Sequence, residues 1–285
     1  MSRIAYVNGR YLPHADAQVH VEDRGYQFAD GVYEVCEVHG GHIVDMTAHL
    51  DRLSRSLAEL RMEWPMPRKA LPFVVREVVR RNGVTEGMVY LQVTRGVATR
   101  DHAFPKSAKP ALVITAKSVD RRAGQRKWER GADVVTIPDT RWARVDIKTV
   151  GLLPNVLARQ HAIENGAHEA WFTDSEGHVL EGASVNAWIV TRGTLLTRPA
   201  NEGILRGITR ATVIKVAEQL GYAFEERPFT VEEAKGADEA FNTAATTVVM
   251  PVVRIDGTVV GNGTPGPMTR ALREAFHSVA ERTAA

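Results

Sequence analysis

Apolar and polar residues alternate along the first part of the chain in the manner of β-strands. The segment IAYVNGRYL has two short apolar runs joined at Asn8-Gly9, which is the strongest short signal for a β-hairpin. The segment GVYEVCEVHGGHIVD repeats this pattern and predicts two strands around Gly40-Gly41. We therefore expect the chain to begin with antiparallel β structure.

The pattern then changes to a helical period. Leucines at helical spacing between residues 50 and 60 predict a long helix with Thr47 as its N-cap. A second helix is predicted from the apolar residues between 71 and 79, and it ends near Gly83. The apolar runs MVYLQVTRG and PALVITAK predict two strands, and the loop between them, VATRDHAFPKSAK, is long enough to suggest a function.

The segment SVDRRAGQRKWERG, residues 118–131, is charged and lacks periodic apolar positions, so we place a domain boundary within it. Beyond it we expect a strand around Lys148, a helix from Pro154 to Gly166, and hairpins in HEAWFTDSEGHVLEG and NAWIVTRGTLL. A glycine-bearing loop, GILRGITR, leads into another helix, and a final helix covers about 268–280. The sequence predicts an α+β protein with two domains, residues 1–120 and 121–285.

Composition limits the function classes. The chain has 285 residues, 44% hydrophobic and 25% charged, with a net charge of +2, which gives no indication of a nucleic-acid or membrane-surface partner. Cys36 is the only cysteine, which excludes an intrachain disulfide and a zinc cluster of thiolates. No apolar segment has the length of a signal peptide or a transmembrane helix, so we expect a cytoplasmic protein.

Several familiar motifs are absent or misleading. GNGTPG fits the dinucleotide pattern G-x-G-x-x-G, but it lies too close to the C-terminus for the required βαβ unit and is better interpreted as a turn. His39 and His42 in HGGH are typical of a glycine hairpin more than of a metal site. The chain has no G-x-S-x-G elbow and no phosphate loop of the Walker type.

Lys148 stands in a mostly apolar run within RWARVDIKTVGLLPNV. Spacing alone favours a lysine whose stem packs on apolar neighbours while its head reaches water. The alternative is a catalytic amine, because burial and nearby positive charge disfavour the ammonium form and leave a nucleophile. A neutral amine condenses with aldehydes, including that of pyridoxal phosphate. This alternative requires further residues that suit the cofactor.

Those residues are present. Gly207, Ile208 and Thr209 lie where GILRGITR leads into a helix, and backbone amides at a helix N-terminus bind phosphate. Arg52, near the start of the first long helix, is a candidate cation for the same phosphate. Glu181 precedes the small residues GASVN and is a candidate carboxylate for the ring nitrogen. Each signal alone is weak, but their co-occurrence favours the cofactor.

With these residues the chain resembles a fold-type IV pyridoxal-phosphate aminotransferase, and within that family it is most similar to the D-amino acid (D-alanine) aminotransferases. The resemblance is carried by DRGYQFADGVYEV, AHLDRL, QVTRG, DIKTVGLLPNVLA, LEGASVN, ILRGITR and VVRIDG, in the family's order and spacing. It implies a two-domain architecture, with a small N-terminal α/β domain that holds the substrate-carboxylate loop. The larger C-terminal pseudo-barrel domain would bind the cofactor and carry the Schiff-base lysine.

The resemblance also implies residue roles. Lys148 would form the internal aldimine and move the proton between substrate and cofactor, and Glu181 would pair with the pyridine nitrogen. Leu205 would pack against the ring. The expected phosphate ligands are Arg52, Gly207 and the amides of Ile208, Thr209, Ala245 and Thr246. One departure occurs at Ala245, where the family often has a hydroxyl residue.

Substrate choice is implied by other positions. Tyr33, Arg100 and His102 match residues that bind the substrate α-carboxylate in D-amino acid aminotransferases, where the arginine–histidine loop comes from the other subunit of a homodimer. A guanidinium, an imidazole and a phenol suit a carboxylate. We therefore expect a ping-pong transaminase that moves the amino group of D-alanine or D-glutamate to 2-oxoglutarate or pyruvate.

Other functions stay open at this point. An enzyme with the same cofactor could be a branched-chain L-amino acid aminotransferase, an R-selective amine transaminase or an aminodeoxychorismate lyase. A catalytically silent dimeric ligand-binding protein is the alternative outside enzymes, and a yellow colour of the purified protein would argue against it.

Overall fold

The computed structural model describes residues 3–200 and 203–285, which form two compact units. The first unit contains the described residues up to Asp120 together with Ile147–Gly151 and Glu281–Ala285, and the second contains Arg121–Asp146 and Leu152–Ala280. The sequence-based assignment of Lys148 to the domain that begins at residue 121 was wrong. The segment around Lys148 belongs to the first unit because Lys148 and Val150 hydrogen-bond to the backbone of Tyr33 and Gly31.

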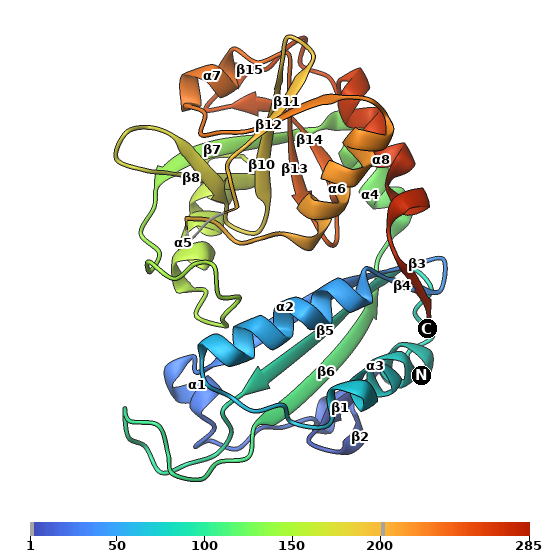
Figure 1. The fold of residues 1–285 in the computed structure, drawn as a ribbon, viewed down its shortest axis with the longest axis vertical. Coiled ribbons are helices and arrows are strands. Elements are labelled where there is room, and N and C mark those ends of the chain that lie inside the picture. Colours follow the sequence, from blue (N-terminus) through green and yellow to red (C-terminus); the bar gives the residue numbers. More distant parts are fainter. Residues whose placement is uncertain (1–2, 201–202) are drawn as a thin grey trace. The chain divides into compact units, whose positions relative to one another are not determined.

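A seven-stranded antiparallel sheet forms the first unit, in the order β16-β4-β3-β5-β6-β1-β2 (Figure 1). Its strands are β1 (Ile4–Val7), β2 (Arg10–Pro13), β3 (Gly31–His39), β4 (His42–Val44), β5 (Gly87–Thr94), β6 (Ala111–Ser118) and β16 (Arg282–Ala284). Asn8 and Gly9 both have positive φ, as the tight hairpin between β1 and β2 requires. Both hairpins predicted for the start of the chain are confirmed.

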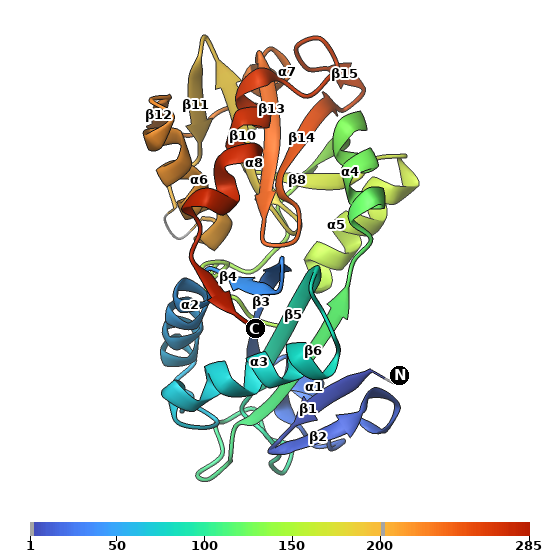
Figure 2. The same ribbon diagram turned by 90° about the vertical axis from the view of Figure 1, so that its right-hand side faces the viewer.

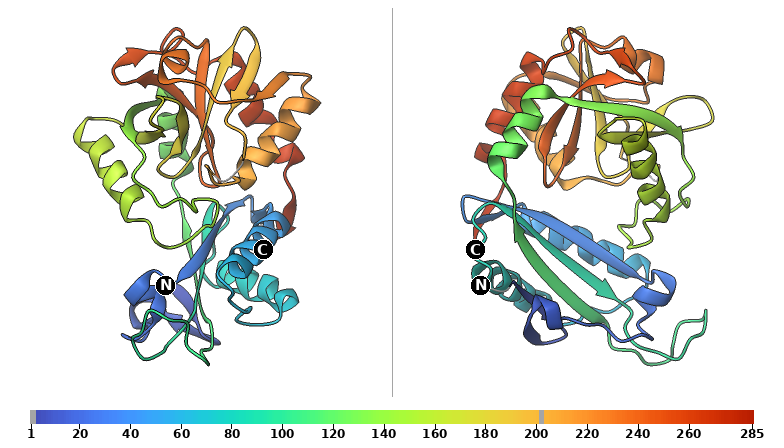
Figure 3. Two further views of the ribbon diagram at one scale, coloured as in Figure 1. Left: turned by 60° about the vertical axis from the view of Figure 1, so that its left-hand side comes forward. Right: turned by 180° about the vertical axis from the view of Figure 1, so that it is seen from behind.

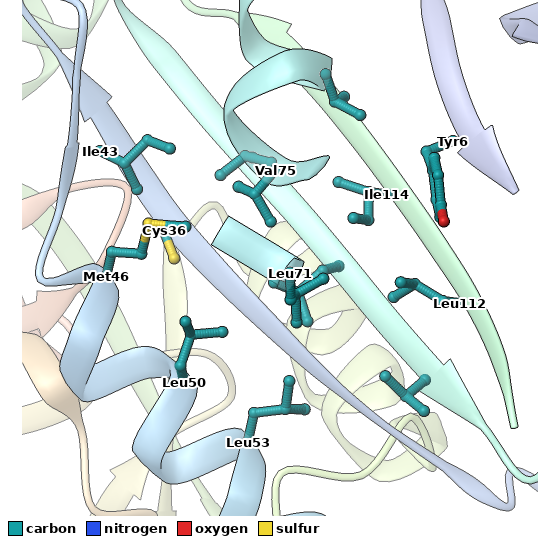
Figure 4. Close-up of a cluster of buried hydrophobic side chains, with 14 of the residues drawn as sticks. Tyr6, Cys36, Ile43, Met46, Leu50, Leu53, Leu71, Val75, Leu112 and Ile114 are labelled. Carbon is teal, nitrogen blue, oxygen red and sulfur yellow. The ribbon is translucent and has the colours of Figure 1, made fainter. Parts of the chain in front are cut away.

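Two long helices cover this sheet. The helical segments of the unit are η1 (His14–Asp16), α1 (Arg24–Phe28), α2 (Met46–Glu59), η2 (Arg68–Ala70) and α3 (Leu71–Arg81). α2 packs on β3 and α3 on β6, and their apolar faces enclose a core with Leu53 and Leu71 near its centre (Figure 4). Thr47 is not the N-cap of α2, because the helix begins at Met46 and the Thr47 hydroxyl donates a hydrogen bond to Glu281.

The second unit contains a mixed nine-stranded sheet in the order β12-β11-β10-β13-β14-β7-β8-β9, with β15 paired to β14. The strands are β7 (Ala132–Pro138), β8 (Glu169–Thr173), β9 (Val179–Gly182), β10 (Asn186–Thr191), β11 (Thr194–Thr197), β12 (Ala223–Glu226), β13 (Glu239–Ala244), β14 (Val248–Ile255) and β15 (Thr258–Val259). A tight turn, in which the amide of Gly182 donates to the carbonyl of Val185, places β9 beside β10. The sheet therefore curls on itself, as the predicted pseudo-barrel requires.

The helices of the second unit are α4 (Arg121–Arg130), α5 (Leu153–Glu164), α6 (Ile208–Gln219), α7 (Val231–Lys235) and α8 (Pro267–Val279). Within the segment 118–131, where we placed the domain boundary, residues Arg121–Arg130 form α4. Trp128 is buried and its indole N–H donates to the carbonyl of Val249, which anchors α4 although the helix has few apolar residues. The α+β prediction is confirmed. No helix within the described ranges is long and apolar enough to cross a membrane.

A buried ion network joins α2 to the sheet of the first unit. The Glu34 carboxylate, fully buried on β3, accepts hydrogen bonds from Arg52 Nε and Nη2, both at 2.7 Å, and contacts His49 Nδ1 at 2.7 Å. Burial alone would raise the pKa of Glu34, but the Arg52 charge and the hydrogen bonds from Arg52 and His49 outweigh it and lower the pKa from 4.5 to about 2. The network fixes the orientation of Arg52 on α2.

Replacing Glu34 by Gln should therefore destabilise the protein in a pH-dependent way. The folded-state pKa lies below the unfolded one, so the stabilisation is complete above about 4.5 and is lost as the pH falls toward about 2. At neutral pH we expect E34Q to lower the free energy of unfolding by about 3–5 kcal/mol, because Arg52 loses its buried counter-charge. Urea denaturation between about pH 7 and about pH 3 measures both effects.

Glu77→Gln is the matched control. The pKa of Glu77 is also lowered to about 2, first by the hydrogen bond from Arg80 and then by that from Arg81, but this group lies at the solvent-exposed surface of α3. Water screens such a pair, so E77Q should change stability far less than E34Q. Equal losses in the two variants would contradict the account of the buried network.

Candidate active site

Lys148 lies in an irregular segment and not in a strand, since only a single bridge between Thr149 and Val32 joins it to the edge of β3. Its Nζ donates a hydrogen bond of 3.3 Å to the hydroxyl of Tyr33 and lies 4.3 Å from the centre of the Tyr33 ring. Tyr33 in turn stacks on Tyr90, with the ring centres 5.6 Å apart. Burial, together with the nearby Tyr33, raises the pKa of Tyr90 to about 12, so this phenol stays neutral.

Arg52 and Lys148 both belong to the first unit, and each is held beside β3. Burial would lower the pKa of Arg52, but Glu34 outweighs it and raises the pKa, so the guanidinium is permanently charged. A guanidinium has five N–H donors, so the bidentate contact with Glu34 is compatible with a contact to an anion. The predicted role of Arg52 on a phosphate stays a prediction.

Arg100 and His102 are exposed on the long connection between β5 and β6, which projects from the ends of these strands (Figure 3). Both side chains contact the ring of Phe28 on α1. Within the described part of the chain, no hydrogen bond, ion pair or ring contact joins either of them to Tyr33. The structure of one chain therefore does not bring together the three residues expected at the substrate carboxylate.

Glu181 occupies a buried position at the end of β9 in the second unit. Its carboxylate accepts hydrogen bonds from Arg141 Nη1 at 2.5 Å, from Asn186 Nδ2 at 3.0 Å and from the backbone amide of Leu205 at 3.1 Å. Burial would lower the pKa of Arg141, but the hydrogen bonds from its side chain to Asp139 and the Glu181 charge raise it. Glu181 is thus held by three hydrogen-bond donors from different segments of the second unit.

The N-terminus of α6 is formed by Gly207, Ile208 and Thr209, as the sequence predicted. Among the described residues, no side chain caps this end, although the first amides of a helix have no partner within the helix. Gly207 cannot carry a side chain, because a Cβ atom there would overlap with Oδ1 of Asn186. Asn186 also donates to the carbonyl of Leu205 and so fixes the loop that leads into the helix.

Ala245 and Thr246 lie in the tight turn between β13 and β14, at the same end of the second unit as the start of α6 (Figure 2). Val248, the first residue of β14 after this turn, has a φ of 56°, which is rare for a β-branched residue and indicates a strained backbone. The hydroxyl of Thr247 is buried and has no hydrogen-bond partner within the described residues. An anion bound at this turn would satisfy such an orphaned donor.

Sequence reasoning missed Glu34, Arg141 and Asn186. Glu34 carries a signal, since it shares one face of β3 with Val32, Cys36 and Val38, where a carboxylate is out of place unless it is paired. Arg141 and Asn186 carry none, because their contacts to Glu181 depend on segments separated along the chain by 40 and 5 residues, which the curled sheet brings together.

Comparison with known proteins agrees with this arrangement. Residues 31–255 match the family described as amino-transferase class IV. A protein of Staphylococcus haemolyticus named D-alanine aminotransferase is 40% identical over 277 residues, which cover 97% of each chain.

Solved structures are similar over nearly the whole chain. The branched-chain amino acid aminotransferase of Escherichia coli superposes with a TM-score of 0.91 at 26% identity, covering 98% of this chain and 95% of the other. That of Thermobaculum terrenum, solved in its PLP-form, has a TM-score of 0.84 at 26% identity, covering 98% and 94%. The fold, the family match and the full-length relatives lead to one conclusion: the chain belongs to the class IV aminotransferases, which are pyridoxal-phosphate-dependent transferases.

Proposed function

We propose that this chain is a transaminase that moves the amino group of a D-amino acid, such as D-alanine or D-glutamate, to a 2-oxo acid such as 2-oxoglutarate or pyruvate. The observation that carries the proposal is the 40% identity, over 97% of both chains, to a protein named D-alanine aminotransferase. The two structures named branched-chain aminotransferases share the fold at only 26% identity.

The residues present fit pyridoxal phosphate. In the first unit, Lys148 offers an amine beside a phenol and Arg52 offers a fixed cation. In the second unit, Glu181 offers a carboxylate to the ring nitrogen. The phosphate would be held by Gly207 and by the backbone amides of Ile208, Thr209, Ala245 and Thr246. Leu205 would pack on the pyridine ring. The orphaned hydroxyl of Thr247 offers a donor close to Ala245, where the family often has a hydroxyl residue.

Lys148 performs the proton transfers in this proposal. Its Nζ would hold the cofactor, and its amine would remove the proton from the substrate α-carbon. When bound, the cofactor supplies an electron sink that stabilises negative charge at that carbon. The Tyr33 hydroxyl, which accepts from Nζ at 3.3 Å, keeps the amine in position between the two proton transfers. A second 2-oxo acid reverses these steps and completes the ping-pong cycle.

The substrate carboxylate is proposed to contact Tyr33, Arg100 and His102. Because Arg100 and His102 do not contact Tyr33 within one chain, we assign them to the site of a second copy of the chain. Helix α5 supports an association of two copies, since it exposes a stripe of apolar side chains at helical spacing. The residues of this stripe, between 55% and 68% exposed, are Leu153, Val156, Leu157 and Ile163.

A second candidate function is that of a branched-chain L-amino acid aminotransferase. The observation in its favour is the TM-score of 0.91 to a protein of that name. The two functions use the same cofactor and the same lysine, so they differ in the substrate they accept and in its handedness.

The purified protein should show the visible absorbance of the bound cofactor, and D-alanine should bleach this band while L-alanine should not. We expect Lys148→Ala to lose the band of the covalent complex and its turnover, because no other amine takes its role. Lys117→Ala, at an exposed position on β6, is the control and should keep both. Bleaching by L-leucine instead would establish the second candidate, and a colourless protein after addition of pyridoxal phosphate would contradict both.

Mixed dimers test whether Arg100 serves the other subunit. Arg100→Gln should raise the KM for D-alanine, and Lys148→Ala should be inactive. If the loop reaches the neighbouring site, a dimer with one chain of each kind has one complete site, so it should regain the wild-type KM with about half of the wild-type kcat. A KM that stays as high as in the Arg100→Gln protein, or a monomer in sedimentation, would refute the assignment.

A further inference from the structure

Backbone contacts join the first part of the loop that carries Arg100 and His102 to α1 and to the residues just before this helix. Asp23 and Val97 form an isolated antiparallel bridge, and the amide of Arg24 donates to the carbonyl of Gly96 at 2.9 Å. These backbone contacts end at Ala98, whose amide donates a hydrogen bond to the carbonyl of Glu22. Beyond this point the loop has to be positioned by side chains.

The exposed side chains of Arg100 and His102 both contact the ring of Phe28. The Arg100 guanidinium carbon lies 5.0 Å from the centre of the Phe28 ring, and the His102 ring centre lies 5.4 Å from it. Arg24 also lies over this ring, at 4.8 Å. The spacing between the two groups proposed to bind a carboxylate is therefore set by one aromatic side chain on α1.

Arg24 and Arg95 contact the loop and are themselves buried, with exposed fractions of 3% and 7%. The Arg24 guanidinium donates to the carbonyl of Asp101 at 2.5 Å and to that of His102 at 3.4 Å. The Arg95 guanidinium lies 3.7 Å from the centre of the Phe104 ring. The two cations thus contact the loop on either side of Ala103, next to the residues proposed to bind the substrate.

One carboxylate connects both cations. Asp30 Oδ2 accepts from Arg24 Nε at 2.8 Å and from Arg95 Nε at 2.7 Å, while Oδ1 accepts from Arg95 Nη2 at 3.0 Å. The Asp30 side chain is only 10% exposed, and such charge-assisted contacts are the strong ones in a protein. Without Asp30, both guanidinium groups would be buried without this counter-charge, and each would be free to turn away from the loop.

We propose that Asp30 is a positioning residue: by holding Arg24 and Arg95, it places Arg100 and His102 and so determines the preference for substrates that carry an α-carboxylate. The inference rests on the proposed function of Arg100 and His102. Misplacement of a binding group by about 1 Å is enough to weaken recognition strongly. The effect should fall on carboxylate recognition, while proton transfer by Lys148 continues.

Asp30→Asn tests this directly, because it keeps the shape of the side chain and removes its charge. We expect the KM values for D-alanine and for the 2-oxo acid to rise together by about tenfold or more, with kcat within about twofold of the wild type. Propionate, which has the carboxylate and the methyl group of D-alanine but no amine, should lose affinity as an inhibitor by a similar factor. Amide hydrogen exchange between residues 98 and 106 should become faster.

Phe104→Leu provides a second variant that spares the buried charges, since Phe104 is on the exposed loop and loses its stacking on Arg95 and on Arg61. It should shift the same KM values and the propionate affinity in the same direction. Phe73→Leu is the matched control, because Phe73 is an exposed phenylalanine on α3 that stacks with Arg76 at 4.7 Å. It should leave every one of these values unchanged.

Arg100→Gln separates failure of this inference from failure of the proposed function. If Arg100→Gln leaves the KM for D-alanine unchanged, the proposed carboxylate site is wrong. If it raises KM while Asp30→Asn and Phe104→Leu do not, the positioning role is wrong and the site stands. A fall in kcat and stability of Asp30→Asn with unchanged KM and propionate affinity also overturns the inference. The double variant with Arg100→Gln should match Arg100→Gln alone.

Discussion

The pairing of a short irregular segment with the edge of β3 is the contact on which the proposed site depends. β4 is too short to cover the whole of β3, so the edge near Gly31 and Tyr33 would present unpaired backbone groups. Residues 147–151 satisfy them: the amide of Tyr33 donates to the carbonyl of Lys148, and that of Val150 donates to the carbonyl of Gly31. Burial of Ile147 in the core of the first unit completes the anchor, and Lys148 Nζ is thereby placed at the Tyr33 hydroxyl.

Arg52, Glu181 and the loop of Arg100 are each held by buried ion pairs. Glu34 fixes Arg52, and Arg141 with Asn186 surrounds Glu181. Asp30 connects the two arginines beneath the loop of Arg100. A buried pair adds little net stability, but removal of one partner is costly because the other charge is left without compensation. These networks therefore specify orientation more than they stabilise the fold, and transaminase chemistry requires such orientation.

The errors of the sequence-based prediction share one cause. No helix was predicted in the segment 118–131, which lacks an apolar period, yet Arg121–Arg130 is helical and the single side chain of Trp128 anchors it. The Lys148 segment has the apolar composition of a strand but makes one bridge only, and it belongs to the first unit although it lies beyond residue 121. Thr47 has the right residue type for an N-cap, but the helix begins one residue earlier and its hydroxyl binds Glu281. In each case a contact distant in sequence outweighed the local pattern.

The sequence by itself determined the hairpins at Asn8-Gly9 and Gly40-Gly41, the leucine-lined helix, the start of the helix at Gly207 and the choice of Lys148 and Glu181 as residues of interest. These depend on periodicity, turn chemistry and residue type, which are local properties. Only the tertiary structure decided that Glu34 orients Arg52, that Arg141 and Asn186 surround Glu181, and that Asp30 lies beneath the loop of Arg100. Such partners are chosen by sheet register and helix packing, which bring together groups that no local pattern connects.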